Sequence, residues 1–338
     1  MISLLGAAAT TQLKAADANP LRNIGGAPAG FPVRFRAARD SGKPFDFVDY
    51  CHSLGLGVVE TRLPQGPPAD LRRKVESYGM RLILDVGFPR AEDEVAAFDT
   101  RVKTAKECGA ISLHAAMTGR RYEDFRTFDA FKTSFEKNQK SIEWAEPILR
   151  KHQLRLGLEN HKGWRSAEQA AWLKRVSSEW VGVHFDYGNN LSLCEPPDET
   201  LRNLLPYAIS AHLKDMALEM YEDGFLLSEV PLGEGVLNLK DMTAKLRTKD
   251  PNMPLDLEMI TRDPLKIPIF TDGYWVTFNN AYSPLPGEDV ARTIALIMQN
   301  KPKQPLPRVT GLSHEAQLKL EDECITKSID YARRNLAA

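Results

Sequence analysis

Four short apolar segments of this chain each end in a side chain that can bind a metal ion. They span residues 154–159, 181–186, 208–212 and 254–258, and they end in Glu159, Asp186, His212 and Glu258. Apolar runs of this length are typical of buried β-strands. A carboxylate at the end of a buried strand is costly unless a partner compensates its charge. Four such endings in succession predict a shared site for a metal ion or a polar substrate.

Four further segments with the character of strands precede these, at residues 31–36, 57–62, 80–85 and 110–114. Helical patterns alternate with all eight strands, and several have the expected boundary residues, such as Pro68 at a start and Gly79 at an end. Alternating strands and helices predict a parallel sheet, and eight units favour a closed (β/α)8 TIM barrel over an open sheet. No G-x-G-x-x-G motif follows the first predicted strand, which argues against dinucleotide binding.

The chain divides into three predicted parts. Residues 1–20 are expected to be a disordered tail or the remnant of a signal peptide, because an apolar start is followed by a small-x-small cleavage pattern at 16–18. Residues 21–300 form the barrel, and residues 301–338 form a linker and a C-terminal helix packed on the barrel or on a second subunit. As written, the chain is expected in the cytoplasm; an upstream twin-arginine segment would instead direct it to the periplasm.

Composition restricts the partners of the chain. A net charge of −1 without a basic block provides no electrostatic surface for nucleic acid. No apolar run approaches the ~18 residues needed to span a bilayer. The four cysteines contain no C-x-x-C pair, so free thiols are expected rather than a disulfide framework or a zinc site. The expected partner is a small molecule, with neither nucleic acid nor membrane involved; a homo-oligomer stays open.

The four polar strand ends should converge, because all strands of such a barrel open onto one face at their carboxyl ends. Three carboxylates and one imidazole suit Mn²⁺, Mg²⁺, Co²⁺ or Fe²⁺ better than an ion that prefers thiolates. Four protein ligands leave about two positions of an octahedral shell for substrate oxygens. The alternative is a set of unrelated ion pairs at strand ends.

The motifs around these residues resemble those of the sugar phosphate isomerase/epimerase superfamily, the xylose isomerase-like barrels. They are E-N-H at 159–161, D-x-G-N at 186–189, H-x-K-D at 212–215 and the strand-borne Glu258. The resemblance covers most of residues 30–300. That group also contains ketose 3-epimerases, inosose dehydratases and endonuclease IV. Where a ketose 3-epimerase has a substrate-contacting histidine shortly after the metal aspartate, this chain has Y-G-N-N at 187–190.

The resemblance implies one divalent metal ion held by Glu159, Asp186, His212 and Glu258, with Mn²⁺ expected first and Mg²⁺, Co²⁺, Fe²⁺ or Zn²⁺ as alternatives. It also implies that Glu159 and Glu258 form an acid/base pair. An ion chelated by a carbonyl and a neighbouring hydroxyl oxygen acidifies the C–H bond between them and stabilises an enediolate. One glutamate removes the proton and the other returns it.

The expected function is therefore a divalent-metal-dependent isomerase or epimerase of a sugar or keto-sugar. A lyase or hydratase acting on a 3-keto-glycoside is the alternative, because the same enolate can expel a neighbouring group. An endonuclease IV-like repair enzyme is less expected, since the charge of the chain suggests no basic groove. The loops after the last two strands contain no clear glycine-rich phosphate nest, which favours an unphosphorylated sugar.

Further polar residues lie near these strand ends. The predicted substrate-binding residues are His161, Lys214, Asn189, Arg262, Trp275, Glu60 and His114. For Trp275 the expected role is a ring stacked on a sugar face, with ordinary packing as the alternative. His184 and Asp256 each precede a predicted metal ligand by two positions, so we expect both to face the barrel interior and to support the ligands by hydrogen bonding.

Overall fold

Eight parallel strands close into a barrel in the computed structural model, which describes residues 19–337. In chain order they are β1 (Ile24–Gly26), β2 (Val58–Arg62), β3 (Arg81–Asp85), β4 (Ser112–Ala116), β5 (Leu156–Glu159), β6 (Val181–Asp186), β7 (Ala208–Leu213) and β10 (Leu255–Leu257). β1 pairs with both β2 and β10, which closes the ring. The expected TIM barrel is confirmed.

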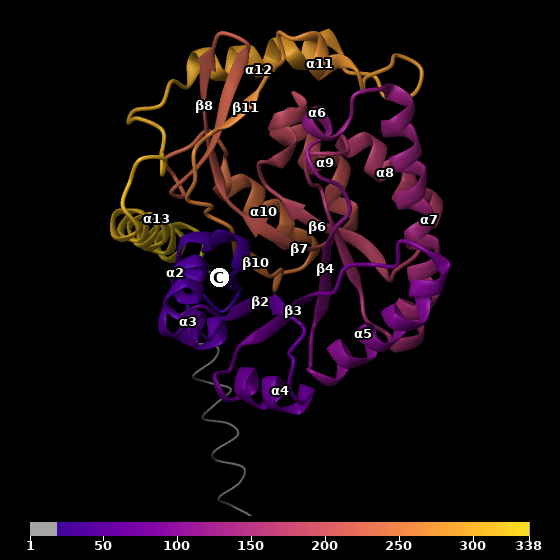
Figure 1. Ribbon diagram of the computed structural model, residues 1–338, viewed down its shortest axis with the longest axis vertical. Helices are drawn as coiled ribbons and strands as arrows, with labels where there is room; N and C mark the ends of the chain where they lie inside the picture. Colours follow the sequence, from indigo (N-terminus) through magenta and orange to yellow (C-terminus); the bar gives the residue numbers. More distant parts are fainter. Residues whose placement is uncertain (1–18, 338) are drawn as a thin grey trace, which may run out of the picture.

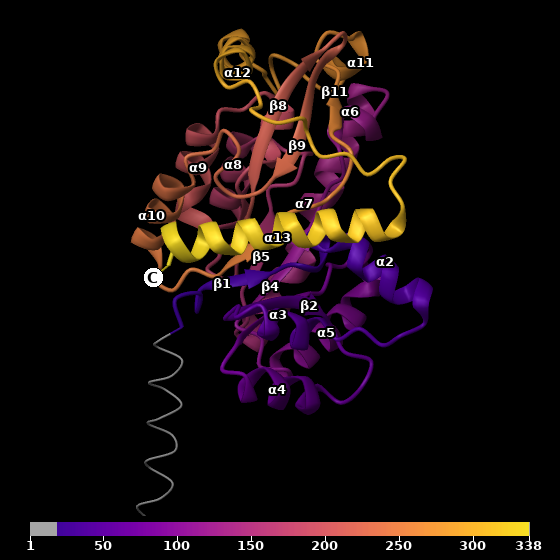
Figure 2. The same ribbon diagram turned by 90° about the vertical axis from the view of Figure 1, so that its left-hand side faces the viewer.

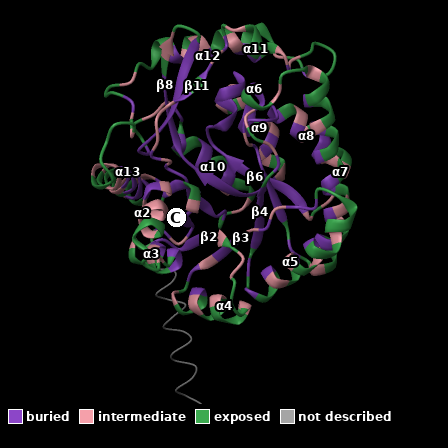
Figure 3. Cartoon of the chain, in the orientation of Figure 1, coloured by how far each residue is buried: buried purple, intermediate pink, exposed green. Residues whose placement is uncertain are grey.

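Helices surround the barrel on its outside (Figure 1). They are α2 (Pro32–Ser41), α3 (Phe47–Ser53), α4 (Pro68–Ser77), α5 (Val95–Glu107), α7 (Phe128–His152), α8 (Ser166–Val176), α9 (Pro197–Leu204) and α10 (Leu239–Lys249). The strands are buried, whereas the helices bury one side and expose the other (Figure 3). This arrangement places apolar residues of both layers in one continuous core.

The first strand is not the predicted one. Residues 31–36 alternate apolar and polar side chains, but Pro32 occupies the first position of α2, where its fixed φ favours a helix. The strand is Ile24–Gly26, whose two glycines give little β-propensity. Glycine is required there because a Cβ on Gly25 would lie 1.9 Å from Oδ1 of Asp256. The prediction of a strand at residues 31–36 is therefore wrong.

A second, three-stranded sheet was absent from the sequence prediction. β7 is followed directly by the antiparallel hairpin of β8 (Asp215–Tyr221) and β9 (Gly224–Val230), and β11 (Leu265–Ile267) pairs with β9. In Figure 1 this sheet lies beside α11 (Asp272–Trp275) and α12 (Gly287–Gln299), at the end of the molecule above the barrel. It therefore extends the molecule beyond the carboxyl end of β7.

The C-terminal helix α13 (His314–Asn335) packs on the barrel, across α2 (Figure 2). The buried carboxylate of Glu321 accepts hydrogen bonds from the backbone N–H groups of Val33 (2.8 Å) and Arg34 (2.9 Å), at the first turn of α2. Free N–H groups at a helix start favour such a carboxylate. One of the two expected positions for this helix is thus observed; a homo-oligomer stays a prediction.

The predicted tail or signal remnant at residues 1–20 falls almost entirely on residues 1–18, which lie outside the described residues. Between residues 19 and 337, none of the helices combines the length and the apolar character that a bilayer crossing requires.

Candidate metal centre

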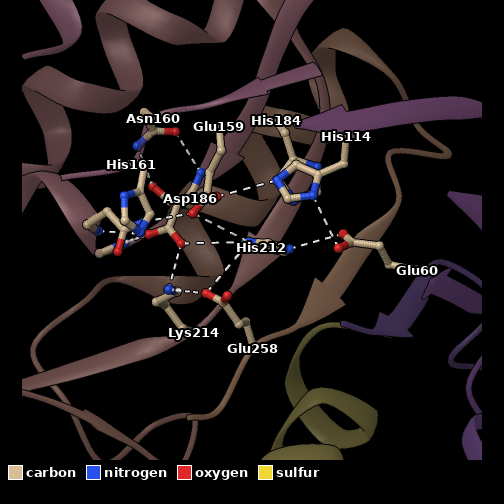
Figure 4. A network of polar contacts seen from close by, with 12 residues as sticks. Glu60, His114, Glu159, Asn160, His161, His184, Asp186, His212, Lys214 and Glu258 are labelled. Atoms are coloured by element: carbon tan, nitrogen blue, oxygen red, sulfur yellow. Dashed lines mark hydrogen bonds and ion pairs between the residues drawn. The ribbon is translucent and has the colours of Figure 1, made fainter. Parts of the chain in front are cut away.

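Glu159, Asp186, His212 and Glu258 meet at the carboxyl ends of their strands (Figure 4). Each offers one ligand atom, and these atoms all lie within 4.8 Å of one another. Glu159 and Asp186 are the last residues of β5 and β6, His212 lies near the end of β7, and Glu258 follows β10. All four side chains are buried. The parallel register of neighbouring strands therefore gathers residues that lie far apart in the sequence.

The imidazole of His212 faces the three carboxylates. Its Nδ1 lies 3.7 Å from Oε1 of Glu159, 4.0 Å from Oδ2 of Asp186 and 3.6 Å from Oε2 of Glu258. These separations are too long for hydrogen bonds. This buried Nδ1 has no hydrogen-bond partner among the described residues. Burial alone would lower the pKa of His212, but the carboxylates around it raise the pKa well above its usual range.

Asparagine side chains and backbone amides orient two of the carboxylates. Oδ1 of Asp186 accepts from the backbone N–H groups of Gly188 (2.9 Å) and Asn189 (2.7 Å). Nδ2 of Asn189 donates to Oε1 of Glu159 (2.8 Å). The side chain of Asn160 bonds to both backbone groups of Asp186. The D-x-G-N and E-N-H motifs therefore hold the ligand residues in place, and Asn189 contacts Glu159 directly.

Lys214 lies against the same carboxylates. Its Nζ is 2.6 Å from Oδ2 of Asp186 and forms a second ion pair with Oε2 of Glu258. Burial alone would raise the pKa of Glu258, but Lys214 and His212 hold it below its usual range. Burial alone would lower the pKa of Lys214, but the same ion pairs raise it, which favours the charged ammonium. Lys214 thus offsets part of the negative charge of the cluster.

Glu60 bridges two histidines on the other side of the site. Its Oε2 lies 3.1 Å from Nε2 of His212, and its Oε1 lies 3.2 Å from Nδ1 of His114. Nε2 of His114 lies 3.4 Å from Oε2 of Glu159. Burial would lower the pKa of His114, but Glu60 and Glu159 raise it to about 10. Glu60 and His114 therefore touch the predicted metal ligands rather than forming a solvated rim.

His184 and Asp256 lie in the barrel interior, as their positions in the strands indicate, but neither side chain forms the predicted hydrogen bond to a proposed metal ligand among the described residues. The ring of His184 packs against those of His114 and His212, at centroid separations of 4.4 and 4.1 Å, and its Nδ1 lies 2.7 Å from Oγ of Ser210. Burial and the two neighbouring histidines lower the pKa of His184, so this ring is neutral. Burial and the nearby Glu60 raise the pKa of Asp256, whose oxygens have no hydrogen-bond partner among the described residues.

The cluster fits a divalent ion. An ion about 2 Å from each of its ligand atoms keeps those atoms about 3–4 Å apart. The separations around Nδ1 of His212 fall within this range. The partner of Nε2 of His212 is the Glu60 carboxylate, an arrangement that fixes the tautomer of metal-binding histidines. Three carboxylates and one imidazole form a donor set for a hard or borderline cation.

The remaining predicted substrate-binding residues make different contacts from one another. Nδ1 of His161 donates to the carbonyl of Gly119 (3.1 Å), which leaves Nε2 as an acceptor beside the cluster (Figure 4). Arg262 is paired with Glu229 on β9 through two contacts. Trp275 donates its indole N–H to the carbonyl of Ile269 and packs on Phe278. The observed contacts of Trp275 are those of ordinary packing.

Two buried charged residues near the site were missed from the sequence. Glu229 lies on the unpredicted strand β9, and Lys162 lies in the loop between β5 and α8. Lys162 follows the E-N-H motif directly, so its position was a usable signal. Its burial was not predicted, because a lysine in a loop is usually solvated.

Comparison with known proteins assigns the chain to one family of TIM barrels. A family model described as a xylose isomerase-like TIM barrel matches residues 35–277. The chain is 26% identical over 109 residues to a 3-oxo-isoapionate decarboxylase of Pectobacterium atrosepticum, covering 32% of this chain and 40% of that protein. It is 23% identical over 211 residues to the uncharacterized protein YihM of Escherichia coli, covering 60% and 62%. The matches thus span less than two thirds of either relative.

Among solved structures, a D-psicose 3-epimerase with D-tagatose from Clostridium cellulolyticum H10 shares the fold, with a TM-score of 0.60. Its sequence is 13% identical, and the alignment covers 94% of this chain and 100% of that chain. At this identity the likeness concerns the fold alone. Together with the family match, it confirms the resemblance drawn from the four motifs.

Proposed function

The chain belongs to the xylose isomerase-like TIM barrel family, and we propose that it is a divalent-metal-dependent isomerase or epimerase of a sugar or keto-sugar. The observation that supports this most strongly is the meeting of Glu159, Asp186, His212 and Glu258 at the carboxyl end of the barrel. In our proposal these four residues hold one ion, with Mn²⁺ expected first. Family members of known activity are enzymes, and the E-N-H and H-x-K-D motifs support the sugar class.

Glu159 and Glu258 are the proposed acid/base pair. They come from β5 and from the end of β10, which flank β6 and β7 in the order of the barrel, and their carboxylates lie 3.7 and 3.6 Å from Nδ1 of His212. In our proposal the substrate binds with one of these carboxylates on each face. One glutamate, as the carboxylate, removes the proton next to the carbonyl, and the other, as the protonated acid, donates a proton to the opposite side of the same carbon or to its neighbour. Nearby cations lower the pKa values of both groups against the effect of burial, which favours the ionised form needed by the base. The glutamate that acts as the acid must therefore take up a proton from solvent before it donates one.

The bound ion would supply the Lewis acidity that stabilises the enediolate of the substrate. Asn189 keeps Glu159 oriented through its 2.8 Å hydrogen bond, and Glu60 keeps the ring of His212 oriented. Lys214, charged and beside Glu258, offsets negative charge that develops on the substrate. His161, with Nε2 free as an acceptor, is our candidate for contact with a substrate hydroxyl.

A lyase or hydratase acting on a 3-keto-glycoside is the second candidate. It is favoured by the similarity to a protein named as a decarboxylase. Both candidates begin with an enolate formed next to a carbonyl. In the isomerase or epimerase this enolate takes up a proton again, whereas in the lyase or hydratase it expels a neighbouring group. The same acid/base pair would serve either reaction.

Deuterium exchange tests the proposal. The protein with bound Mn²⁺ is incubated in D₂O with a panel of ketoses and 3-keto-glycosides, and the carbon-bound protons are followed by NMR. We expect deuterium at one carbon next to a carbonyl, and the product then distinguishes epimerase, isomerase and lyase. Samples stripped of metal and samples without protein are the controls. Absence of exchange in every panel member, with Mn²⁺ shown to be bound, would contradict the proposal.

A further inference from the structure

Lys162 is a buried cation without a carboxylate of its own. Only 3% of the residue is exposed. Its Nζ donates to Oδ1 of Asn189, a neutral amide, and no ion pair joins it to a carboxylate within residues 19–337. A buried ammonium with no compensating charge is costly. Lys162 therefore has the chemistry of a group that awaits an anionic partner.

The charged groups around Lys162 do not supply that partner. The cations that act on it are Lys214 and Arg262, and the carboxylates are Asp186 and Glu229. Each carboxylate already has a cation, because Lys214 pairs with Asp186 at 2.6 Å and Arg262 pairs with Glu229 through two contacts. Burial and the neighbouring Lys214 lower the pKa of Lys162 to about 8.

A metal ion sharpens the imbalance. A divalent cation together with Lys214 would balance the three carboxylates of the cluster, and Arg262 balances Glu229. Lys162 is then the positive charge in excess among these groups of the described chain. A neutral sugar would leave that excess in place. A substrate with one negative charge would remove it.

We propose that the substrate is a sugar acid, a polyhydroxy ketone with a carboxylate, and that this carboxylate binds the ammonium of Lys162. The inference rests on the proposed function, because the keto end of the substrate would occupy the metal cluster. An ammonium has three N–H donors, and Asn189 uses one of them. Charge-assisted hydrogen bonds from the other donors would fix the direction in which the substrate enters.

A purely positioning role is the competing account of Lys162. Its contact Asn189 donates to Oε1 of Glu159, so the lysine could act through that amide on the proposed base. Loss of a positioning residue would weaken the binding of acid and neutral substrates alike. Loss of a carboxylate-binding residue would weaken the binding of the acids selectively. Paired ligands that differ only in the carboxylate therefore separate the two roles.

Two such pairs are 5-keto-D-gluconate with L-sorbose and D-tagaturonate with D-tagatose. Each pair shares the ketone, the hydroxyls and every stereocentre, and differs only in carboxylate against hydroxymethyl. Calorimetry on the Mn²⁺-loaded protein would give the four affinities for the wild type, Lys162→Met and Lys162→Arg. The control is Lys174→Met, the same change on the exposed side of α8. Thermal melting and Mn²⁺ content verify that each variant is folded and loaded.

We expect at least one acid to bind the wild type at least tenfold more tightly than its neutral partner. Lys162→Met should abolish this preference, Lys162→Arg should retain part of it, and Lys174→Met should leave it unchanged. A preference that survives in Lys162→Met would overturn the inference, because the carboxylate would then bind elsewhere, for instance the ion. Equal affinities within both pairs, or no binding of either acid, would overturn it too. Deuterium exchange into a neutral ketose would still leave the proposed function standing.

Discussion

Polar side chains enter the barrel from two halves that differ in how those side chains are held. On β5, β6 and β7 and directly after β10, the four clustered residues point toward one another, with Nδ1 of His212 at 3.6–4.0 Å from the carboxylates. On β2 and β4, Glu60 and His114 are joined at 3.2 Å, and Glu60 also holds His212 at 3.1 Å. In the first half, Nδ1 of His212 has no hydrogen-bond partner among the described residues, whereas in the second half the carboxylate of Glu60 pairs with two imidazoles.

This difference indicates that the first half binds the proposed ion and that the second half orients its ligands. A buried ring nitrogen that faces three carboxylates without a hydrogen-bond partner suits an ion, because the ion supplies the missing interaction. Ion-paired residues behind them fix the orientation of the ligand rings and raise ligand basicity. We therefore expect substitutions in the first half to abolish chemistry, and substitutions in the second half to weaken metal binding while leaving chemistry measurable.

The largest effect is expected for Glu159→Gln in the first half, which contains the proposed metal ligands. The substitution removes the proposed base but keeps an oxygen near the ion, so turnover of any sugar that undergoes exchange should fall by about 10³-fold or more. Part of the Mn²⁺ affinity should remain. Steady-state kinetics with saturating Mn²⁺ measures the loss, and Glu179→Gln, an exposed glutamate, is the matched control. Near-normal turnover in Glu159→Gln would rule out its catalytic role.

A smaller effect is expected for Glu60→Gln in the second half, which contains the residues that orient the proposed ligands. The amide cannot hold the rings of His114 and His212 as the carboxylate does, so Mn²⁺ affinity should fall by about 10–100-fold. Turnover at saturating Mn²⁺ should fall far less than in Glu159→Gln. Calorimetric titration of Mn²⁺ measures the change. If Glu60→Gln binds Mn²⁺ like the wild type, the supporting role is wrong.

The smallest effect concerns stability alone. Gly25→Ala adds a Cβ at 1.9 Å from Oδ1 of Asp256 and 2.7 Å from Cβ of Val58, so the barrel must shift where β1 meets β10 and β2. The free energy of unfolding should fall by about 1–3 kcal/mol. Gly66→Ala is the control, because no atom lies within 4 Å of the Cβ it adds. Urea unfolding of both variants tests this, and equal stabilities would refute the close approach.

The four proposed metal ligands could be predicted from the sequence, whereas much of the rest of the fold and of the site could not. Glu159, Asp186, His212 and Glu258 stand out because a polar residue ends each apolar run. β1 was missed because Ile24–Gly26 contains two glycines, selected by close packing against Asp256 and Cys51 rather than by strand propensity. Packing partners distant in the sequence leave no local pattern.

The neighbours of the cluster were harder to predict for a similar reason. Lys162 lies in a loop, where a lysine is usually solvated, and only the fold shows that it is buried beside Asn189. Glu229 lies on a hairpin that the sequence prediction lacked, and its partner Arg262 comes from the loop after β10. Pairs such as these depend on tertiary contacts, which a single sequence does not reveal.

The most direct test of the central claim is a calorimetric titration of Mn²⁺ into the metal-free protein, repeated with His212→Ala. The four clustered residues are expected to bind one ion per chain, and His212→Ala should lower the affinity by at least about 100-fold, because it removes a ligand that the others cannot replace. Melting curves verify that the variant is folded. No binding to the wild type, or the same affinity in His212→Ala, would contradict the assignment of this cluster as a metal centre.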